Sequence, residues 1–184
     1  MKLTMRLGER SYDIILKRGA LHNLGLLANL NRRVLIVTDS GVPAEYAEIV
    51  RAQGEGSKCL KVYESLLRRM LELGFDRGDL VVAVGGGVVG DLAGFVAATY
   101  MRGVDFINCP TTTLSQIDSS IGGKVAVDLG AAKNIVGAFW QPRLVVVDPD
   151  TLSTLPRRHF INGLAEAVKA GLIADEDLFE LFET

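Results

Sequence analysis

The stretch LVVAVGGGVVGDLAGFVAATY, residues 80–100, decides the fold class. It begins with a continuous apolar run, residues 80–84, of the kind that forms a strand buried on both faces of a parallel sheet. Three glycines follow in the order G-x-G-x-x-G at Gly85, Gly87 and Gly90, and a helix is predicted directly after them. Such a turn lets backbone N–H groups approach a pyrophosphate at the helix N-terminus. A tight structural turn is the alternative, and the motif alone favours neither.

The acidic residue that usually accompanies this glycine motif is displaced. It is expected about 20 residues further on, at the end of the next strand, where it binds ribose hydroxyls. Asp105 comes too early and stands at the beginning of the predicted strand. Asp39, at the end of the preceding predicted strand, is the alternative partner for a ribose.

Similar patterns on both sides extend this unit into an α/β fold. Residues 1–16 predict a hairpin that turns at Gly8-Glu9-Arg10. The other expected strands are at residues 33–38, 106–109 and 144–147, and the other expected helices at residues 19–29, 43–53 and 58–73. Strands alternating with helices favour a Rossmann-like parallel sheet with helices on both faces.

From residue 156 onward only helices are predicted, at residues 160–173 and 175–183. We therefore expect one α/β domain over residues 1–155 and the first helices of a second, all-helical domain over residues 156–184. The pattern stops in the middle of that second domain. The sequence is expected to be a truncated piece of a longer protein.

Composition excludes several classes of function. Of 184 residues 48% are hydrophobic and 23% charged, with a net charge of −2, so no overall field attracts nucleic acid or an anionic membrane. No signal peptide and no apolar stretch of about 18 residues is present, which predicts a cytoplasmic protein. Cys59 and Cys109 do not form a CxxC pair and are expected to be small buried hydrophobes in a reducing compartment.

A polar stretch after the third predicted strand is a candidate anion site. TTTLSQIDSSIGGK at residues 111–124 places Gly122 and Gly123 beside Lys124, so that exposed backbone amides adjoin a point charge. A solvated loop is the alternative, and it explains Asp128 well. A solvated loop does not account well for four other polar residues, which lie in a long stretch with few further charges. They are Asp118, Lys124, Lys133 and Asn134.

A third candidate group lies in the predicted helix that contains NGLAEAVK, residues 162–169. Glu166 and Lys169 are three residues apart and share a helical face, as in many surface ion pairs. Their neighbours are apolar, however, which predicts a largely buried helix. A buried carboxylate needs a partner or a metal ion.

In this order, the blocks resemble the 3-dehydroquinate synthase family. They are GGGVVGDLAGFVAATYMRG (85–103), PTTTLSQIDSSIGGK (110–124), KNIVGAFWQP (133–142) and the segment from LP at 155–156 to NGLAEAVK. The resemblance covers about residues 33–173. It implies an N-terminal NAD-binding domain, a C-terminal helical domain with most of a Zn²⁺ (or Co²⁺) site, and a homodimer. The implied reaction converts 3-deoxy-D-arabino-heptulosonate 7-phosphate to 3-dehydroquinate and phosphate in the shikimate pathway.

The resemblance also assigns roles to individual positions. Those matching the family's NAD contacts are Asp39, Glu55, Lys58, Gly86, Gly87, Asp91, Thr111, Thr112, Thr154 and Leu155. Those matching its substrate pocket are Asp118, Lys124, Lys133, Asn134 and Lys169. Arg102 matches an arginine that reaches the substrate phosphate of the neighbouring subunit, and Glu166 matches a zinc ligand.

The sequence departs from the family in three places. About one strand's length of chain is lacking after Gln53, either as a true deletion or because residues are missing from this sequence. His159 replaces a common glutamate, and the family's C-terminal half, with the two histidines that complete its zinc site, is absent. Three other readings stay open: another sugar-phosphate cyclase (2-deoxy-scyllo-inosose or epi-valiolone type), a metal-dependent polyol dehydrogenase, and a nucleotide-binding module without turnover.

Overall fold

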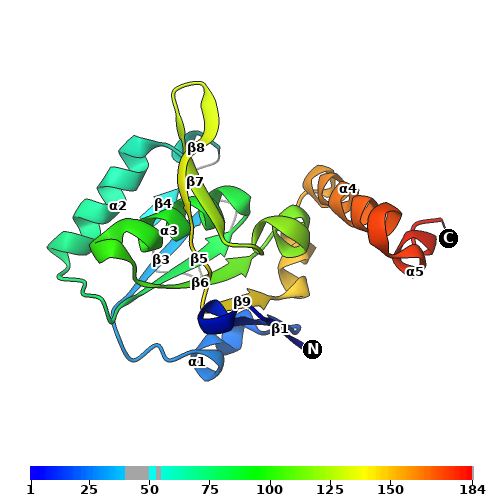
Figure 1. Cartoon of the computed structure of the whole chain (residues 1–184), viewed down its shortest axis with the longest axis horizontal. Helices are drawn as coiled ribbons and strands as arrows, with labels where there is room; N and C mark the ends of the chain where they lie inside the picture. Colours follow the sequence, from blue (N-terminus) through cyan, green and yellow to red (C-terminus); the bar gives the residue numbers. More distant parts are fainter. Residues whose placement is uncertain (40–49, 53–54, 184) are drawn as a thin grey trace.

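A seven-stranded sheet in the order β1-β2-β9-β6-β5-β3-β4 forms the centre of the molecule (Figure 1). The structure, a computed structural model, describes residues 1–39, 50–52 and 55–183. Only β1 (Lys2–Met5) is antiparallel to its neighbour β2 (Tyr12–Leu16); all other neighbours are parallel, which confirms the predicted parallel α/β sheet. The other strands are β3 (Val34–Asp39), β4 (Val50–Ala52), β5 (Leu80–Gly85), β6 (Asp105–Pro110) and β9 (Leu144–Val147).

Both faces of the sheet are covered, as the continuous apolar strands predict. On β5, Val81 and Ala83 face a core formed with α2 (Leu60–Glu72) and α3 (Gly87–Thr99). Val82 and Val84 of the same strand face the opposite core, which includes side chains from the 3-10 turn η2 (Leu21–Asn23) and from α1 (Leu24–Leu27). Every residue of β5 is buried.

Two helix predictions need correction. The helix expected over residues 19–29 is a 3-10 turn followed by the four-residue α1. Residues 50–52 form β4 rather than the end of a helix, and residues 43–49 lie outside the described part of the chain. The helix expected over residues 58–73 is confirmed as α2, in which Leu66 and Met70 are buried and Leu71 is exposed. Packing against α3 and the sheet, rather than helical periodicity alone, selects the buried positions.

A two-stranded antiparallel sheet, β7 (Lys124–Leu129) and β8 (Ala132–Phe139), was not predicted from the sequence. It packs on α3 and extends beyond it in Figure 1. Val125 and Val127 are buried in the same core as α3, and a Cβ atom at Gly94 would collide with Val125. This glycine therefore allows β7 to approach the helix closely.

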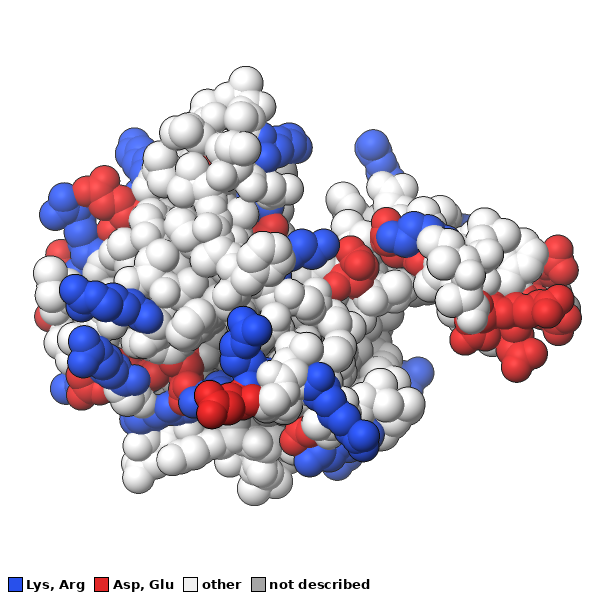
Figure 2. Space-filling model, viewed as in Figure 1, with Lys and Arg blue, Asp and Glu red and all other residues white. Residues whose placement is uncertain are grey.

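The C-terminal helices, α4 (Arg157–Ala174) and α5 (Glu176–Glu180), follow the 3-10 segment η7 (Pro149–Thr154) and extend to one side of the sheet (Figure 1). On the face in Figure 2 basic and acidic side chains are interspersed, except that acidic ones gather at the far end of these helices. Only Gly163 and Gly171 of α4 are buried, so the expectation of a largely buried helix is wrong. No helix in the described residues is long and apolar enough to cross a membrane.

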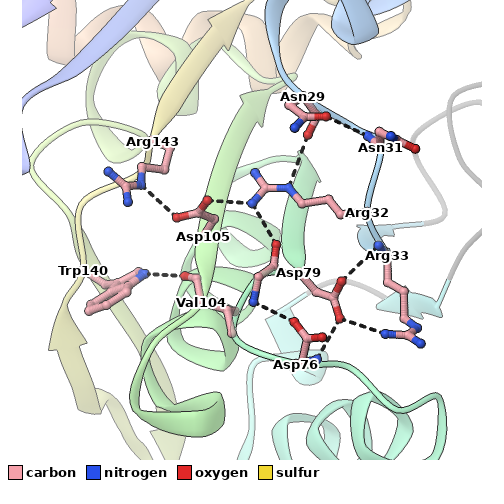
Figure 3. A network of polar contacts seen from close by, with 11 residues as sticks. Asn29, Asn31, Arg32, Arg33, Asp76, Asp79, Val104, Asp105, Trp140 and Arg143 are labelled. Carbon is pink, nitrogen blue, oxygen red and sulfur yellow. Dashed lines mark hydrogen bonds and ion pairs between the residues drawn. The ribbon is translucent and has the colours of Figure 1, made fainter.

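A polar network holds together the edge at which the parallel strands begin (Figure 3). Asp105 accepts hydrogen bonds from Arg32 (2.7 Å) and Arg143 (2.8 Å). Asp79, which is 4% exposed, accepts from the backbone N–H groups of Arg33 (3.0 Å) and Asp76 (2.7 Å). Asp105 thus binds two arginines at the edge of the sheet opposite the glycine turn. This position agrees with the expectation from the sequence that Asp105 is not the ribose ligand.

Candidate active site

The order of the strands creates a crevice at the carboxyl ends of β3 and β5. The chain continues from β3 to β4 on one side, and β5 lies on the other side of β3. In open parallel sheets ligands bind at such a switch point, where the connections diverge. Asp39 ends β3 and Gly85 ends β5, so the acidic residue and the glycine turn meet at this edge.

The glycine turn leaves little space for side chains. Gly86 is the N-cap of α3, and a Cβ atom built on it would lie 3.1 Å from Cγ2 of Thr112. A Cβ atom on Gly87 would lie 3.0 Å from Oγ of Ser119. The backbone N–H of Thr111 donates to the carbonyl of Gly85 (2.9 Å). The structure therefore brings Gly86, Gly87, Thr111 and Thr112 together at the open N-terminus of α3, which suits an anion.

A buried lysine connects three separate elements next to this turn. Lys58 is 5% exposed and stands just before α2. Its ammonium lies 2.5 Å from a carboxylate oxygen of Asp91 in α3, and it also donates to the side-chain oxygen of Asn134 in β8. Burial of a charge is tolerated only with such partners. Two positions matched to NAD and one matched to the substrate thus form one cluster.

A cleft of about 460 Å³ opens beside this cluster. Its polar lining comes from Asp91, Asp118, Ser119, Lys124 and Asn134, and the hairpin supplies its apolar lining. Asp118 lies in a single π-helical turn, η6 (Ser115–Ser119), a local geometry that is frequent at functional sites. The cleft combines carboxylates, an ammonium and a carboxamide, groups that bind hydroxyls and phosphate.

Glu166 and Lys169 form an ion pair on α4, as their spacing predicts, with Lys169 exposed to solvent. The hydrogen bond to Glu166 raises the pKa of Lys169, and the negative charge of Asp118 raises it further. Because η6 packs against α4, the ion pair on α4 lies near the turn that contributes Asp118 to the cleft. The part of the chain that the structure describes contains no group of three His, Cys, Asp or Glu residues able to hold a metal ion.

Other predicted site residues lie apart from the cleft lining. Arg102 ends the turn η5 (Tyr100–Arg102) with a left-handed φ of 70°, close to the start of β6 and hence at the opposite edge of the sheet. Lys133 is exposed on β8. Thr154 and Leu155 end η7, beyond β9. The backbone of Glu55 lies in the 3-10 turn η4 (Glu55–Ser57), but its side chain is outside the described structure.

Sequence reasoning missed the contribution of the β7–β8 hairpin to the cleft. The alternation of Lys124, Val125, Ala126 and Val127, followed by a turn at Gly130, is the signal that could have predicted it. Ser119, which also lines the cleft, gave no such signal in the sequence, because the fold alone decides what lies next to it.

The sequence profile of the 3-dehydroquinate synthase N-terminal family matches residues 48–162. This chain belongs to the 3-dehydroquinate synthase family. Among curated relatives, the 3-dehydroquinate synthase of Pelobacter propionicus is 45% identical over an alignment 199 positions long, which covers 98% of this chain and 55% of the relative. That of Symbiobacterium thermophilum is 48% identical, covering 97% of this chain and 55% of the relative. The chain spans about half the length of the curated relatives it matches.

Solved structures share the fold. A 2-deoxy-scyllo-inosose synthase, complexed with carbaglucose-6-phosphate, NAD⁺ and Co²⁺, is 33% identical with a TM-score of 0.88, covering 96% of this chain and 53% of that one. A 2-epi-5-epi-valiolone synthase from Streptomyces hygroscopicus, with NAD⁺ and Zn²⁺ bound, is 34% identical with a TM-score of 0.86, covering 97% and 54%. A probable glycerol dehydrogenase from Sinorhizobium meliloti, 23% identical over 86% of this chain and 45% of that one, has a TM-score of 0.69 and shows only the common fold.

Proposed function

We propose that this chain is the NAD-binding half of a 3-dehydroquinate synthase, which converts 3-deoxy-D-arabino-heptulosonate 7-phosphate to 3-dehydroquinate and phosphate. The cluster of Lys58, Asp91 and Asn134 beside the glycine turn carries the proposal. It joins residues suited to a nucleotide with residues suited to a polyhydroxylated phosphate at one edge of the sheet. Residues 1–155 would form the NAD domain, and residues 156–184 would begin the helical domain.

The nucleotide would bind at the carboxyl ends of β3 and β5. The N-terminus of α3 at Gly86 and Gly87 would hold its pyrophosphate, since a side chain at Gly86 would enter the space beside Thr112. Asp39 would accept hydrogen bonds from ribose hydroxyls at the end of β3. The remaining residues proposed to contact NAD are Glu55, Lys58, Asp91, Thr111, Thr112, Thr154 and Leu155.

The substrate would occupy the cleft. The Lys124 ammonium would bind its phosphate, with Lys133 and the Asn134 carboxamide as further donors. Asp118 and Lys169, which come from the neighbouring elements η6 and α4, would orient the hydroxyls around the reacting carbons. Bound NAD⁺ would supply hydride abstraction and return, and a bound metal would polarise the hydroxyl on the carbon that is oxidised. Glu166 is the one metal ligand proposed for the described residues, so the other ligands would come from elsewhere.

Arg102 supports assembly as a homodimer. It lies at the edge of the sheet opposite the glycine turn, so it would reach a substrate phosphate only in a neighbouring subunit. The cofactors proposed are NAD and Zn²⁺ or Co²⁺, and the compartment proposed is the cytoplasm.

Assays of NAD binding and of phosphate release test the proposal. The intact protein, meaning this chain together with the helical domain of the family, is incubated with NAD⁺, Zn²⁺ and 3-deoxy-D-arabino-heptulosonate 7-phosphate. It should release phosphate without accumulation of NADH, because a synthase returns the hydride to the substrate. Net NADH production would identify a polyol dehydrogenase instead. NAD binding without any turnover in the intact protein would identify a nucleotide-binding module.

Another sugar-phosphate cyclase is the second candidate, because solved 2-deoxy-scyllo-inosose and valiolone synthases superimpose on this chain with TM-scores of 0.88 and 0.86. Sequence identity favours the first candidate: it is 45% to a 3-dehydroquinate synthase and 33% to the inosose synthase. A panel with glucose 6-phosphate, sedoheptulose 7-phosphate and the heptulosonate phosphate separates them. Turnover of the heptulosonate phosphate, which carries a carboxylate, and of neither other compound supports 3-dehydroquinate synthase.

A further inference from the structure

Asp128 lies at an irregularity in the β7–β8 hairpin. Val127 pairs with Val136 and Leu129 with Ala132, so three residues of β8 stand opposite Asp128 alone. Bulges of this kind redirect side chains and are frequent next to active sites. Here the extra residues of β8 include Asn134, which lines the cleft.

The side chain of Asp128 stabilises this bulge. Its Oδ1 atom accepts a hydrogen bond of 2.7 Å from the backbone N–H of Asn134. Asn134 has a φ of 55°, in the left-handed region, which asparagine adopts at some cost. The carboxylate therefore provides an acceptor for a backbone group at the irregular position and favours this unusual backbone conformation.

The backbone of Asp128 also fixes Lys58. Its N–H donates to the Lys58 carbonyl (2.9 Å), and it forms an isolated bridge with Cys59. The Lys58 ammonium in turn donates to the side chain of Asn134 and pairs with Asp91. The contacts among Asp128, Asn134 and Lys58 close a ring, which we call the Asp128 ring.

We infer that Asp128 is a positioning residue, which holds Asn134 and, through it, the Lys58–Asp91 pair in the geometry that binds ligand. This inference rests on the proposed function and adds a residue to which that function assigns no role. Asp128 does not line the cleft. Its effect on binding should therefore pass through Asn134.

Substitutions at Asp128 and a control at Asp13 test the inference in the 184-residue chain. Asp128→Ala should weaken NAD binding about 10-fold, the loss expected when a hydrogen bond to a positioned group disappears. Asp128→Asn keeps the acceptor oxygen and should bind nearly as well as the wild type. Asp13 lies on β2, and Asp13→Ala removes its ion pair with Lys2 (2.8 Å) and its hydrogen bond from Thr4 (2.7 Å) on β1; this variant should leave NAD affinity unchanged.

A double-mutant cycle distinguishes positioning from general stabilisation. Asn134→Gly keeps access to left-handed φ but removes the carboxamide. If Asp128 acts through Asn134, adding Asp128→Ala to Asn134→Gly should lower NAD affinity less than about 3-fold further. The inference would be overturned if Asp128→Ala lowered NAD affinity equally in the wild type and in Asn134→Gly, or if Asp128→Ala bound NAD as tightly as the wild type. If Asp128→Ala does not fold, Asp128→Glu, which displaces the carboxylate by one methylene, takes its place in the cycle.

Amide hydrogen exchange separates this inference from the proposed function. Exchange at the Asn134 N–H should be slow in the wild type and in Asp128→Asn, and at least about 10-fold faster in Asp128→Ala. If the wild type binds no NAD, the proposed nucleotide site fails, and amide exchange then decides the inference. Unchanged exchange at Asn134 in Asp128→Ala would show that Asp128 does not hold this residue.

Discussion

The guanidinium of Arg32 lies 2.7 Å from a carboxylate oxygen of Asp105, although 73 residues separate them in the chain. Arg143 binds the other oxygen of the same carboxylate (2.8 Å). Asp105 thus connects the segments that lead into β3, β6 and β9 at the edge remote from the cleft (Figure 3). Polar side chains thus lie at both edges of the sheet. The network around Asp105 stabilises the edge at which the strands begin, and the cluster around Lys58 lies at the edge at which they end.

Asp105→Asn should reduce the free energy of unfolding at neutral pH and have little effect in acid. Burial raises the pKa of Asp105, but hydrogen bonds from Arg143 and Arg32 outweigh it, so the pKa lies below its ordinary value of 3.8. Stability from a lowered carboxyl pKa is present above the unfolded-state pKa and is lost as the pH falls through the folded-state pKa. Urea unfolding at about pH 7 and about pH 3 measures the difference.

The control for this experiment is Asp150→Asn. Asp150 pairs with Arg18 (2.5 Å), but both side chains are at least half exposed, and such pairs contribute little. A difference between Asp105→Asn and wild type that stays constant down to pH 3 would show that the ionised carboxylate is not the stabilising group.

Gly87→Val should abolish NAD binding while the fold remains. The added Cβ would lie 3.0 Å from the Ser119 hydroxyl, and its methyl groups would occupy the approach to the N-terminus of α3. Calorimetric titration with NAD⁺ measures the affinity, and circular dichroism checks the fold. Gly25→Val, at an exposed position of α1, is the matched control. Unchanged NAD affinity in Gly87→Val would remove this assignment of the pyrophosphate site.

Lys124→Ala should weaken binding of the sugar phosphate by roughly 10- to 100-fold, because a charge-assisted hydrogen bond contributes about 1.5–3 kcal/mol. NAD affinity should change much less, since Lys124 lines the cleft rather than the glycine turn. Titrations of both ligands with the intact protein provide the comparison. Lys61→Ala, at an exposed position of α2, controls for the loss of a charge. Equal losses for both ligands in Lys124→Ala would indicate a folding defect instead.

The 184-residue chain should bind zinc only weakly, with a dissociation constant above about 1 μM. Catalytic zinc sites use about three protein ligands, whereas the described residues contain no group of three possible ligands, and Glu166, the one ligand we propose, is already paired with Lys169. Titration with zinc, with Glu166→Ala as the comparison, tests this. Submicromolar binding that depends on Glu166 would reveal further ligands, of which His159 is the first to examine.

Local sequence patterns were sufficient for four parallel strands of the central sheet. The strands at residues 33–38, 80–84, 106–109 and 144–147 were predicted within about one residue at each end. The same patterns failed at residues 50–52 and in the hairpin of β7 and β8. These strands are short or polar on one side, so their formation depends on neighbours that no local window contains.

The sequence by itself determined the parallel α/β architecture and the glycine turn, because apolar periodicity and the conformational freedom of glycine act within a few residues. Family resemblance named Lys58, Asp91 and Asn134 one by one, but only the tertiary structure showed that they form one cluster around the buried Lys58 side chain. It also decided that the ion pair of Glu166 and Lys169 is partly exposed to solvent. Burial and charge pairing depend on which distant segments pack together, and that information is spread over the whole chain.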